Sequence, residues 1–360
     1  MLNHLELFAG IGGFRQAIEL LGNDFSIQNN CVGFSEIDPY ATKTYKANYN
    51  IQDEIEIGDV VNFTNNKKNV ESIIDFQLLT GGFPCQAFSM MGKQRGFDDK
   101  RGDVFYRITD ILKIKKPPFV LLENVKNLKS HNKGETFKEI IKSLEECGYP
   151  YIHFDIFNTS NFNLAQTRNR VFIFASKVEL PFEFIFSEKS VQSSFKELTR
   201  QCTILRQENV LDILEKEVEQ KYYLSDRLKP TILSNGSKTF VSNSEINQLI
   251  ARPLTATMVK MHRACQDNYY SDEFLSSENP LYYNTNEFSK QELATHRIRK
   301  ITPKEAFNLQ GFNDKFVENA QNVGISNHQL YKQAGNAVSV NTVYAILHHL
   351  IVKNKILELI

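Results

Sequence analysis

Short apolar runs alternate with amphipathic segments through the first half of the chain. The apolar runs, which we predict to be strands, lie at 4–8, 31–37, 54–60, 76–80, 119–125 and 170–176. The segments between them, which we predict to be helices, include 13–22, 39–49, 103–115 and 135–148, and the last ends in a glycine, a common helix cap. This alternation is typical of a parallel sheet with crossover helices.

The pattern changes after Ser176. Residues 177 to 295 are rich in Ser, Asn, Tyr and Phe and have irregular periodicity, which indicates a second, less regular domain. A predicted helix at 302–312 opens with Thr302 and has Glu305 three residues on, the pattern of a capping box. The last segment, 341–360, is again apolar at helical spacing.

Composition limits the classes of protein to consider. The chain has 360 residues, more than one core usually accommodates, so we expect two domains. Its 42 Lys and Arg balance 42 Asp and Glu, so any basic surface for nucleic acid must be local. Five cysteines without a CxxC pair disfavour a disulfide framework and a zinc site. Neither a secretory leader nor a membrane-spanning apolar run is apparent, so we expect a cytoplasmic protein.

A glycine-rich motif, FAGIGGF at 8–14, follows the first predicted strand and precedes the first predicted helix. Glycines there allow a tight turn and close approach of the backbone to a nucleotide-like cofactor, although a purely structural turn would look the same. Glu36 ends the second strand, where an acid can hold ribose hydroxyls, and Asp59 ends the third. The carboxyl ends of parallel strands line one crevice, so residues 10, 36, 59, 85 and 123 should converge.

The segment GGFPCQAFSMMGKQRGF, 81–97, places Cys85 just beyond the fourth predicted strand, behind Pro84. Most cysteines are inert and buried, and a nucleophilic role needs an activating environment. The glycines and cations that follow, Lys93 and Arg101 among them, suggest a cationic lid over a bound substrate.

Two further motifs carry charged side chains towards the same region. ENV at 123–125 ends an apolar run, where partial desolvation could raise the pKa of Glu123, although a capping or salt-bridged acid is the plainer interpretation. QTRNRVF at 166–172 offers Arg168 and Arg170, which could fix an anionic or carbonyl group but are also typical of surface ion pairs.

Together these stretches resemble, in order, the signature blocks of the cytosine-5 DNA methyltransferase family. The matching blocks are FAGIGGF, SEID (35–38), GDV (58–60), GGFPCQAFS, ENV, QTRNRVF, RKITPKEAFNLQGF (299–312) and YKQAGNAVSVNTV (331–343). The resemblance implies an α/β, Rossmann-like, S-adenosylmethionine-dependent methyltransferase fold with a mainly parallel sheet. It also implies a catalytic domain at 1–176 completed by 328–360, and a smaller, irregular target-recognition domain at 177–327.

The family pattern implies a role for each matched residue. S-adenosylmethionine would lie against Phe8, Gly10, Ile11 and Gly12, with Glu36 on its ribose, Asp59 on its adenine, Ile37 and Val60 beside the adenine, and Val104, Asn336 and Ala337 completing the pocket. Cys85 would attack carbon 6 of cytosine and Glu123 would bind the exocyclic amine and nitrogen 3. Arg168 and Arg170 would hold the base and the acid in place, and no metal is required.

The implied substrate is double-stranded DNA, from which the target cytosine is rotated out of the stack. Ser89 would contact a phosphate, and Lys93 and Arg101 lie in the segment that closes over the gap. Target reading should fall at 251–270, where Arg252, Lys260 and Arg263 accompany threonines and aromatic residues. The stretch 296–304 contains no acid and is the expected local positive patch. A cognate restriction endonuclease acting on the same site is a possible further partner.

Four other classes of protein share some of these features. A nicotinamide oxidoreductase explains the glycine loop and Glu36 but leaves PCQ and ENV unexplained. A zinc deaminase lacks its signature, because PCQAFS supplies one cysteine instead of two. A tRNA cytosine-5 methyltransferase is the closest alternative, although the sizeable variable region favours a DNA reader. A non-catalytic DNA-binding regulator is disfavoured by the presence of both Cys85 and Glu123.

Overall fold

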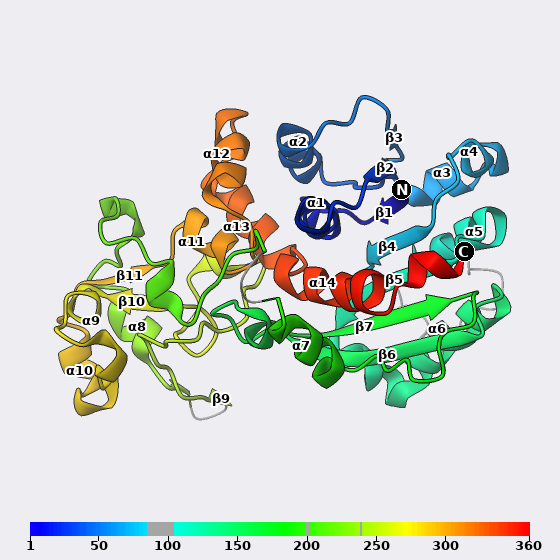
Figure 1. Cartoon of the computed structure of the whole chain (residues 1–360). Coiled ribbons are helices and arrows are strands. Elements are labelled where there is room, and N and C mark those ends of the chain that lie inside the picture. The colour runs from blue at the N-terminus through cyan, green and yellow to red at the C-terminus, as the bar shows by residue number, and fades with distance from the viewer. Residues whose placement is uncertain (85–103, 199–201, 238–239) are drawn as a thin grey trace. The chain divides into compact units, whose positions relative to one another are not determined.

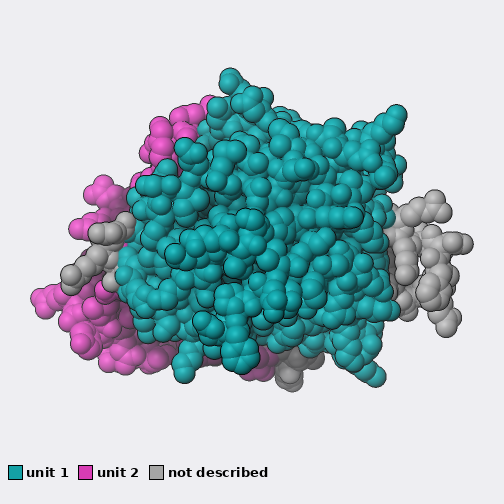
Figure 2. All heavy atoms as spheres, turned by 45° about the vertical axis from the view of Figure 1, so that its right-hand side comes forward, with its two compact units in different colours: residues 1–158, 169–204, 338–360 teal, residues 159–168, 205–337 magenta. Residues whose placement is uncertain are grey.

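The computed structural model describes residues 1–84, 104–198, 202–237 and 240–360 (Figure 1). Contacts divide the described chain into two compact units, coloured separately in Figure 2. Unit 1 comprises Met1–Asn158, Asn169–Ile204 and Val338–Ile360, and unit 2 comprises Thr159–Arg168 and Leu205–Ala337. Unit 1 is therefore built from both ends of the chain. The units divide near residues 204 and 338, whereas the sequence predicts domain boundaries at 176 and 328. The domain boundaries stay a prediction.

The described part of unit 1 contains a seven-stranded sheet in the order β3-β2-β1-β4-β5-β7-β6. Its strands are β1 (Leu2–Leu7), β2 (Asn29–Phe34), β3 (Ile55–Glu56), β4 (Leu78–Gly82), β5 (Phe119–Val125), β6 (Tyr151–Asn158) and β7 (Asn169–Ser176). Strands β3, β2, β1, β4 and β5 pair in parallel, whereas β7 is antiparallel to β5 and to β6 (Figure 1). The expectation of a mainly parallel sheet is confirmed.

The strand β6 was missed by the sequence analysis. Its sequence, YIHFDIFN, has no continuous apolar run, and most of its residues are only half-buried. Such a strand lacks the buried apolar run from which most of the other strands of the sheet were predicted.

Helices cover the sheet of unit 1. They are α1 (Gly13–Phe25), α2 (Pro39–Asn48), α3 (Val60–Thr64), α4 (Lys67–Glu71), α5 (Val104–Lys115), α6 (Glu135–Glu146), α7 (Glu188–Lys196) and α14 (Val340–Leu347). On one face, Leu5 and Leu7 of β1 join Ile108 of α5 and Ile140 of α6 in a buried apolar core. Gly148, which follows α6, has φ +87°, so the predicted glycine cap is confirmed.

The C-terminal helix α14 packs against α1 at the start of the chain (Figure 1). Gly13 at the start of α1 lies so close to Val338 that a Cβ on Gly13 would come within 2.5 Å of the Val338 Cγ1 atom. The absence of a side chain at Gly13 therefore lets the returning C-terminal segment approach the glycine motif.

Unit 2 consists of short elements joined by long irregular segments. Its strands are β8 (Gly236–Ser237), β9 (Phe240–Val241), β10 (Tyr269–Ser271) and β11 (Ile298–Lys300), and its helices are α8 (Lys229–Leu233), α9 (Asp272–Leu275), α10 (Lys290–Leu293), α11 (Pro303–Asn308), α12 (Asp314–Asn322) and α13 (Asn327–Asn336). A separate apolar cluster that includes Ile232, Tyr269 and Ile298 forms its core. The predicted capping box is confirmed, because the amide of Glu305 donates to the Thr302 hydroxyl at 3.2 Å and the amide of Thr302 donates to the Glu305 carboxylate at 2.7 Å.

In the described segments of the chain, no helix is both long and apolar enough to cross a membrane.

Candidate active site

The glycine motif forms a loop that meets the carboxyl end of the neighbouring strand β2. Its backbone is in the left-handed region at Phe8 (φ +55°), Gly10 (φ +56°) and Gly12 (φ +85°). The amide of Phe8 donates to the Ser35 hydroxyl at 3.0 Å, and the amide of Gly10 donates to the Glu36 carboxylate at 2.8 Å. Two of the five strand ends expected to converge therefore touch directly.

The surroundings of this loop suit the nucleoside part of a ligand. A Cβ built on Gly10 or on Gly58 would meet no described atom within 4 Å, so the backbone is open to an approaching group at both places. Ile37 is 75% exposed, so its side chain is available to pack against an apolar face of a ligand. The Glu36 Oε1 atom accepts from the amides of Ile37 (2.9 Å) and Asp38 (2.8 Å), which hold the carboxylate at the rim of the open space.

The other residues predicted to contact the cofactor lie in varied settings. Asp59 is exposed and caps α3, where its carboxylate accepts from the Val61 amide and the Asn62 side chain, both at 2.8 Å. Ile11 and Val60 are buried, whereas Phe8 and Val104 are half-buried. Asn336 and Ala337 belong to unit 2, and their predicted contact with the cofactor stays a prediction.

A second group of polar residues lies at the carboxyl ends of β4 and β5. Glu123 is in register with Gly82, and a Cβ on Gly82 would come within 3.2 Å of the Glu123 Oε2 atom, so this glycine leaves room for the carboxylate. The Glu123 Oε1 atom lies 2.9 Å from the Nε atom of Arg170 on β7, and the two side chains are 12% and 19% exposed. Glu123 is thus an ion-paired acid at the rim of the sheet.

The last described residues after β4 are tied to β5. The side-chain amide of buried Asn124 donates to the Phe83 carbonyl oxygen at 2.7 Å, just before Pro84. Asn124 was not singled out from the sequence, although its place in ENV beside Glu123 is a signal that could have found it. Four residues with predicted roles, Cys85, Ser89, Lys93 and Arg101, lie outside the described residues.

Arg168 and Arg170 are two residues apart but have different partners. Arg170 pairs with Glu123, whereas Arg168 is buried and its guanidinium donates to the carbonyl oxygens of Leu254 (2.8 Å), Gly335 (3.0 Å) and Ala337 (3.0 Å). Buried Gln166 likewise binds main-chain groups, accepting from the Leu254 amide and donating to the Leu309 carbonyl oxygen, both at 2.8 Å. Arg168 and Gln166 therefore join segments of unit 2 that are far apart in the sequence.

The predicted target-reading segment of unit 2 lines a cavity of about 390 Å³. Its lining residues are Arg252, Pro253, Thr255, Thr257, His262, Cys265 and Gln266. The Nε atom of Arg252 donates to the Ala264 carbonyl oxygen at 2.9 Å. Lys260 is exposed and Arg263 half-exposed nearby in the sequence, so the segment presents cations and hydroxyl groups to solvent.

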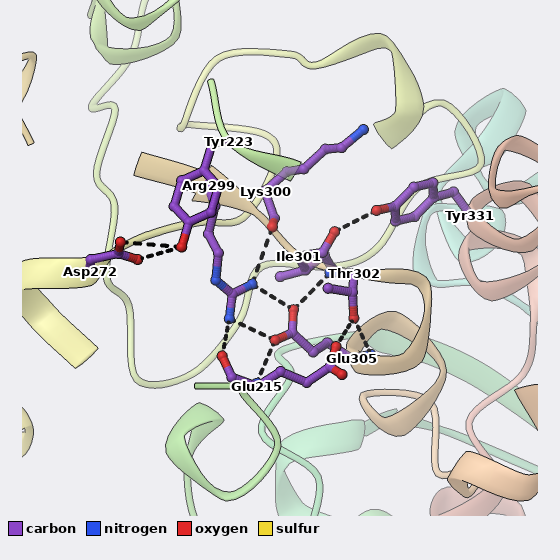
Figure 3. A network of polar contacts seen from close by, with 9 residues as sticks. All are labelled: Glu215, Tyr223, Asp272, Arg299, Lys300, Ile301, Thr302, Glu305 and Tyr331. Carbon is purple, nitrogen blue, oxygen red and sulfur yellow. Dashed lines mark hydrogen bonds and ion pairs between the residues drawn. The ribbon is translucent and has the colours of Figure 1, made fainter. Parts of the chain in front are cut away.

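Three of the four Arg and Lys side chains in residues 296–304, the stretch predicted to be a positive patch, have acidic partners. Arg299 is buried, and its two terminal nitrogens lie 2.7 Å and 2.9 Å from the two carboxylate oxygens of Glu305 (Figure 3). Arg297 pairs with Asp272 at 3.0 Å, and Lys304 pairs with Asp314 at 2.9 Å. Acids that lie outside this stretch of sequence pair with Arg297, Arg299 and Lys304, which a local count of charges could not show.

Across the described ranges, no cluster of three or more His, Cys, Asp or Glu side chains is arranged to hold a metal ion.

Comparison with known proteins identifies the family. Residues 2–352 match the family model described as C-5 cytosine-specific DNA methylase. The chain belongs to this family. It is 37% identical over 342 residues to the Type II methyltransferase M1.ScrFI of Lactococcus lactis subsp. cremoris, an alignment that covers 95% of this chain and 76% of that protein. It is 33% identical over 346 residues to the Type II methyltransferase M.HpaII of Haemophilus parainfluenzae, which covers 95% of this chain and 87% of that one.

Solved structures agree with the fold. The Entamoeba histolytica methyltransferase EhMeth aligns with a TM-score of 0.74 at 21% identity, covering 98% of both chains. The S. pombe Dnmt2 methyltransferase aligns with a TM-score of 0.72 at 19% identity, covering 98% of this chain and 99% of that one. The predicted fold class is confirmed, and so is the predicted family.

The methylase is thus a DNA cytosine-5 methyltransferase, and the methyl donor of its family is S-adenosylmethionine. The roles predicted for individual residues are not tested by these likenesses and remain predictions.

Proposed function

We propose that this methylase transfers the methyl group of S-adenosylmethionine to carbon 5 of a cytosine turned out of a specific DNA sequence, through a transient bond to Cys85. The observation that supports this most is the ion pair of Glu123 with Arg170, at the end of β5 and in register with Gly82. Cys85 follows Gly82 by three residues along the chain. The acid and the cysteine of the family pattern thus start from adjacent strand ends.

The cofactor site we propose is the open space beside the glycine loop. Glu36 would accept from ribose hydroxyls, Ile37 and Val60 would cover the adenine, and the loop backbone of Phe8, Gly10, Ile11 and Gly12 would lie along the ligand. Asp59 would bind the adenine amine, with Val104, Asn336 and Ala337 completing the pocket. The exposed Ile37 and the bare backbone at Gly10 fit a nucleoside. When bound, S-adenosylmethionine supplies a methyl group activated by its sulfonium.

The chemistry requires a nucleophile because carbon 5 of cytosine does not accept a methyl group unaided. The Cys85 thiolate forms a bond to carbon 6, and the electrons of the 5,6 double bond shift towards carbon 5 and, by conjugation through carbon 4, towards nitrogen 3. Glu123, bound to nitrogen 3 and the exocyclic amine, stabilises this addition, so carbon 5 becomes nucleophilic and takes the methyl group. Loss of the carbon 5 proton then restores the double bond and breaks the bond between sulfur and carbon 6. No step needs a metal.

The two arginines would contribute in different ways. Arg170 holds the Glu123 carboxylate through its Oε1 atom, which fixes the orientation of the acid before the base arrives. Arg168 would be a positioning residue, because its guanidinium binds main-chain carbonyls of unit 2.

Target reading we assign to unit 2 and DNA contacts to Ser89, Lys93, Arg101, Arg252, Lys260 and Arg263. The cavity lined by Arg252, Thr255 and Thr257 offers groups that can bond base edges and phosphates. Since the similar proteins are named Type II methyltransferases, we further propose a restriction-modification role in the cytoplasm, with a cognate endonuclease acting on the same double-stranded DNA site.

Bisulfite sequencing of DNA from a host that expresses the methylase tests this proposal. We expect 5-methylcytosine at one cytosine of a single short sequence context. A host expressing Cys85→Ser should show none, while the purified variant still binds S-adenosylhomocysteine. Absence of methylation with the parent protein, or normal methylation with Cys85→Ser, would contradict the proposal.

A further inference from the structure

Tyr49, a buried residue, hydrogen-bonds to the backbone of the glycine loop. The Tyr49 hydroxyl lies 2.8 Å from the carbonyl oxygen of Gly12, to which it donates a hydrogen bond, and 3.2 Å from the Gln16 Oε1 atom. A Cβ built on Gly12 would come within 2.4 Å of the Tyr49 ring, so the ring lies directly against the glycine backbone. Tyr49 follows α2 and is 6% exposed, beyond the reach of a ligand in solvent.

The tyrosine is itself held in place. The Arg15 guanidinium carbon lies 4.4 Å from the centre of the Tyr49 ring, a cation–π arrangement. Arg15 also pairs with Glu54 at 2.6 Å and donates to the Asn50 carbonyl oxygen at 3.0 Å. Burial raises the pKa of Tyr49 well above its ordinary value, so the phenol stays protonated and remains a donor.

A loop with glycines at positive φ needs such support. Glycine loses more conformational freedom on ordering than any other residue, and Gly10 and Gly12 both adopt the left-handed conformation. Glu36 fixes the amide of Gly10 on one side of the loop, and Tyr49 fixes the carbonyl of Gly12 on the other. A loop held at both points is already ordered before its ligand arrives. Binding therefore loses less conformational entropy, which strengthens it.

We propose that Tyr49 is a positioning residue for the methyl donor, acting through the Gly12 carbonyl without touching the ligand. The inference rests on the proposed function, in which Gly10 and Gly12 lie against S-adenosylmethionine. Such a residue strengthens binding equally in the ground state and the transition state. Removing its hydroxyl therefore raises the KM for S-adenosylmethionine and leaves kcat unchanged.

The test compares Tyr49→Phe with Tyr45→Phe. Tyr49→Phe keeps the ring and its contacts with Gly12 and Arg15, and removes the donor. Tyr45 is the matched control, because it is another buried tyrosine of the same cluster whose hydroxyl bonds Arg15 at 3.1 Å and Glu6 at 3.5 Å. The measurements are the dissociation constant of S-adenosylhomocysteine by calorimetry, KM and kcat on methylatable DNA, and the melting temperature.

For Tyr49→Phe we expect both the dissociation constant and the KM to rise about fivefold, which corresponds to the ~1 kcal/mol of one intramolecular hydrogen bond, with kcat within about twofold of the parent. Tyr45→Phe should lower the melting temperature and leave the dissociation constant unchanged. If Tyr49→Phe binds S-adenosylhomocysteine as tightly as the parent, or if both variants lose the same affinity, the role of Tyr49 is overturned and the proposed function is not affected. A parent protein that binds no S-adenosylhomocysteine would overturn the inference and the proposed cofactor site together.

Discussion

Two pairs of an arginine with a glutamate, one in each unit, differ in how completely they are buried. Arg299 and Glu305 in unit 2 are 1% and 0% exposed, and each Glu305 oxygen accepts two hydrogen bonds, from Arg299 and from the amide of Glu215 or Thr302 (Figure 3). Arg170 and Glu123 in unit 1 are 19% and 12% exposed and meet at a strand end. The first pair is fully enclosed and suits a structural role, whereas the second keeps partial exposure at the rim of the sheet, where we propose that the substrate binds.

The Glu305 network extends through unit 2. The Thr302 hydroxyl donates to the Glu215 carboxylate at 2.6 Å, and Arg299 also donates to the Glu215 carbonyl oxygen at 3.0 Å (Figure 3). The irregular segment around Glu215, which precedes α8, is therefore joined to helix α11 through one buried charge pair. Breaking such a pair leaves a buried charge uncompensated, which is far more costly than breaking an exposed pair.

The largest effect is expected when the partly exposed acid loses its charge. Glu123→Gln should lower kcat by about 10²–10⁴-fold, the range for a group that assists proton or charge transfer, because the amide cannot stabilise the cytosine adduct in the same way. The melting temperature should change little, because Glu123 is partly solvated. Single-turnover methylation and thermal unfolding are the measurements. A rate within a few-fold of the parent would remove Glu123 from the chemistry.

Neutralising the enclosed acid should give the opposite pattern. Glu305→Gln leaves the Arg299 charge buried, so the free energy of unfolding should fall by about 3–5 kcal/mol. The loss can be followed by hydrogen exchange in α11. Arg297→Gln is the matched control, since its pair with Asp272 is 58% exposed at the arginine and should contribute less than about 1 kcal/mol. Equal losses in the two variants would show that burial does not decide the contribution.

The smallest effect concerns Glu6 of β1, a fully buried acid whose carboxyl group accepts from the Tyr45 hydroxyl at 3.5 Å. Burial raises the pKa of Glu6 to about 8, although the nearby Arg15 charge lowers it, so the folded protein keeps Glu6 protonated near neutral pH. The unfolded chain releases this proton at lower pH. The stabilisation is therefore complete below the ordinary pKa and is lost as pH rises through about 8.

Glu6→Gln removes this pH dependence. The melting temperature of the parent minus that of the variant should fall by about 5 °C between pH 5 and pH 8, as a change of roughly 3–4 kcal/mol, the linkage for a pKa raised to about 8, would produce in a chain of this length. Burial lowers the pKa of His4 to about 3, but this histidine is present in both proteins and its effect cancels in the difference. A difference that stays constant with pH would mean that Glu6 ionises normally in the fold.

Features set by nearby residues could be predicted from the sequence. The glycine loop, the cap of α6 at Gly148 and the capping box at Thr302 all depend on residues within a few positions, and the structure has each of them. The meeting of Gly10 with Glu36 followed from the geometry of parallel strands. These are the parts of the fold that turn chemistry and hydrophobic period determine.

Features set by distant residues could not be predicted. Arg168 binds carbonyl groups of residues 254, 335 and 337, and nothing near Arg168 in the sequence indicates them. Arg299 looked like part of a surface patch until the fold placed it against Glu305 and the chain around Glu215. The support of the glycine loop by Tyr49 is likewise a contact across 37 positions of sequence.

Trapping on DNA that contains 5-fluorocytosine at the methylated position tests the central claim most directly. Fluorine replaces the hydrogen that must be lost from carbon 5 as a proton, and a base cannot remove it. The bond between sulfur and carbon 6 should therefore persist once the methyl group has been transferred. With S-adenosylmethionine present, we predict a protein–DNA complex that survives denaturation and whose linked peptide contains Cys85. Failure to form that complex under conditions of normal methylation, or linkage through another residue, would contradict the account.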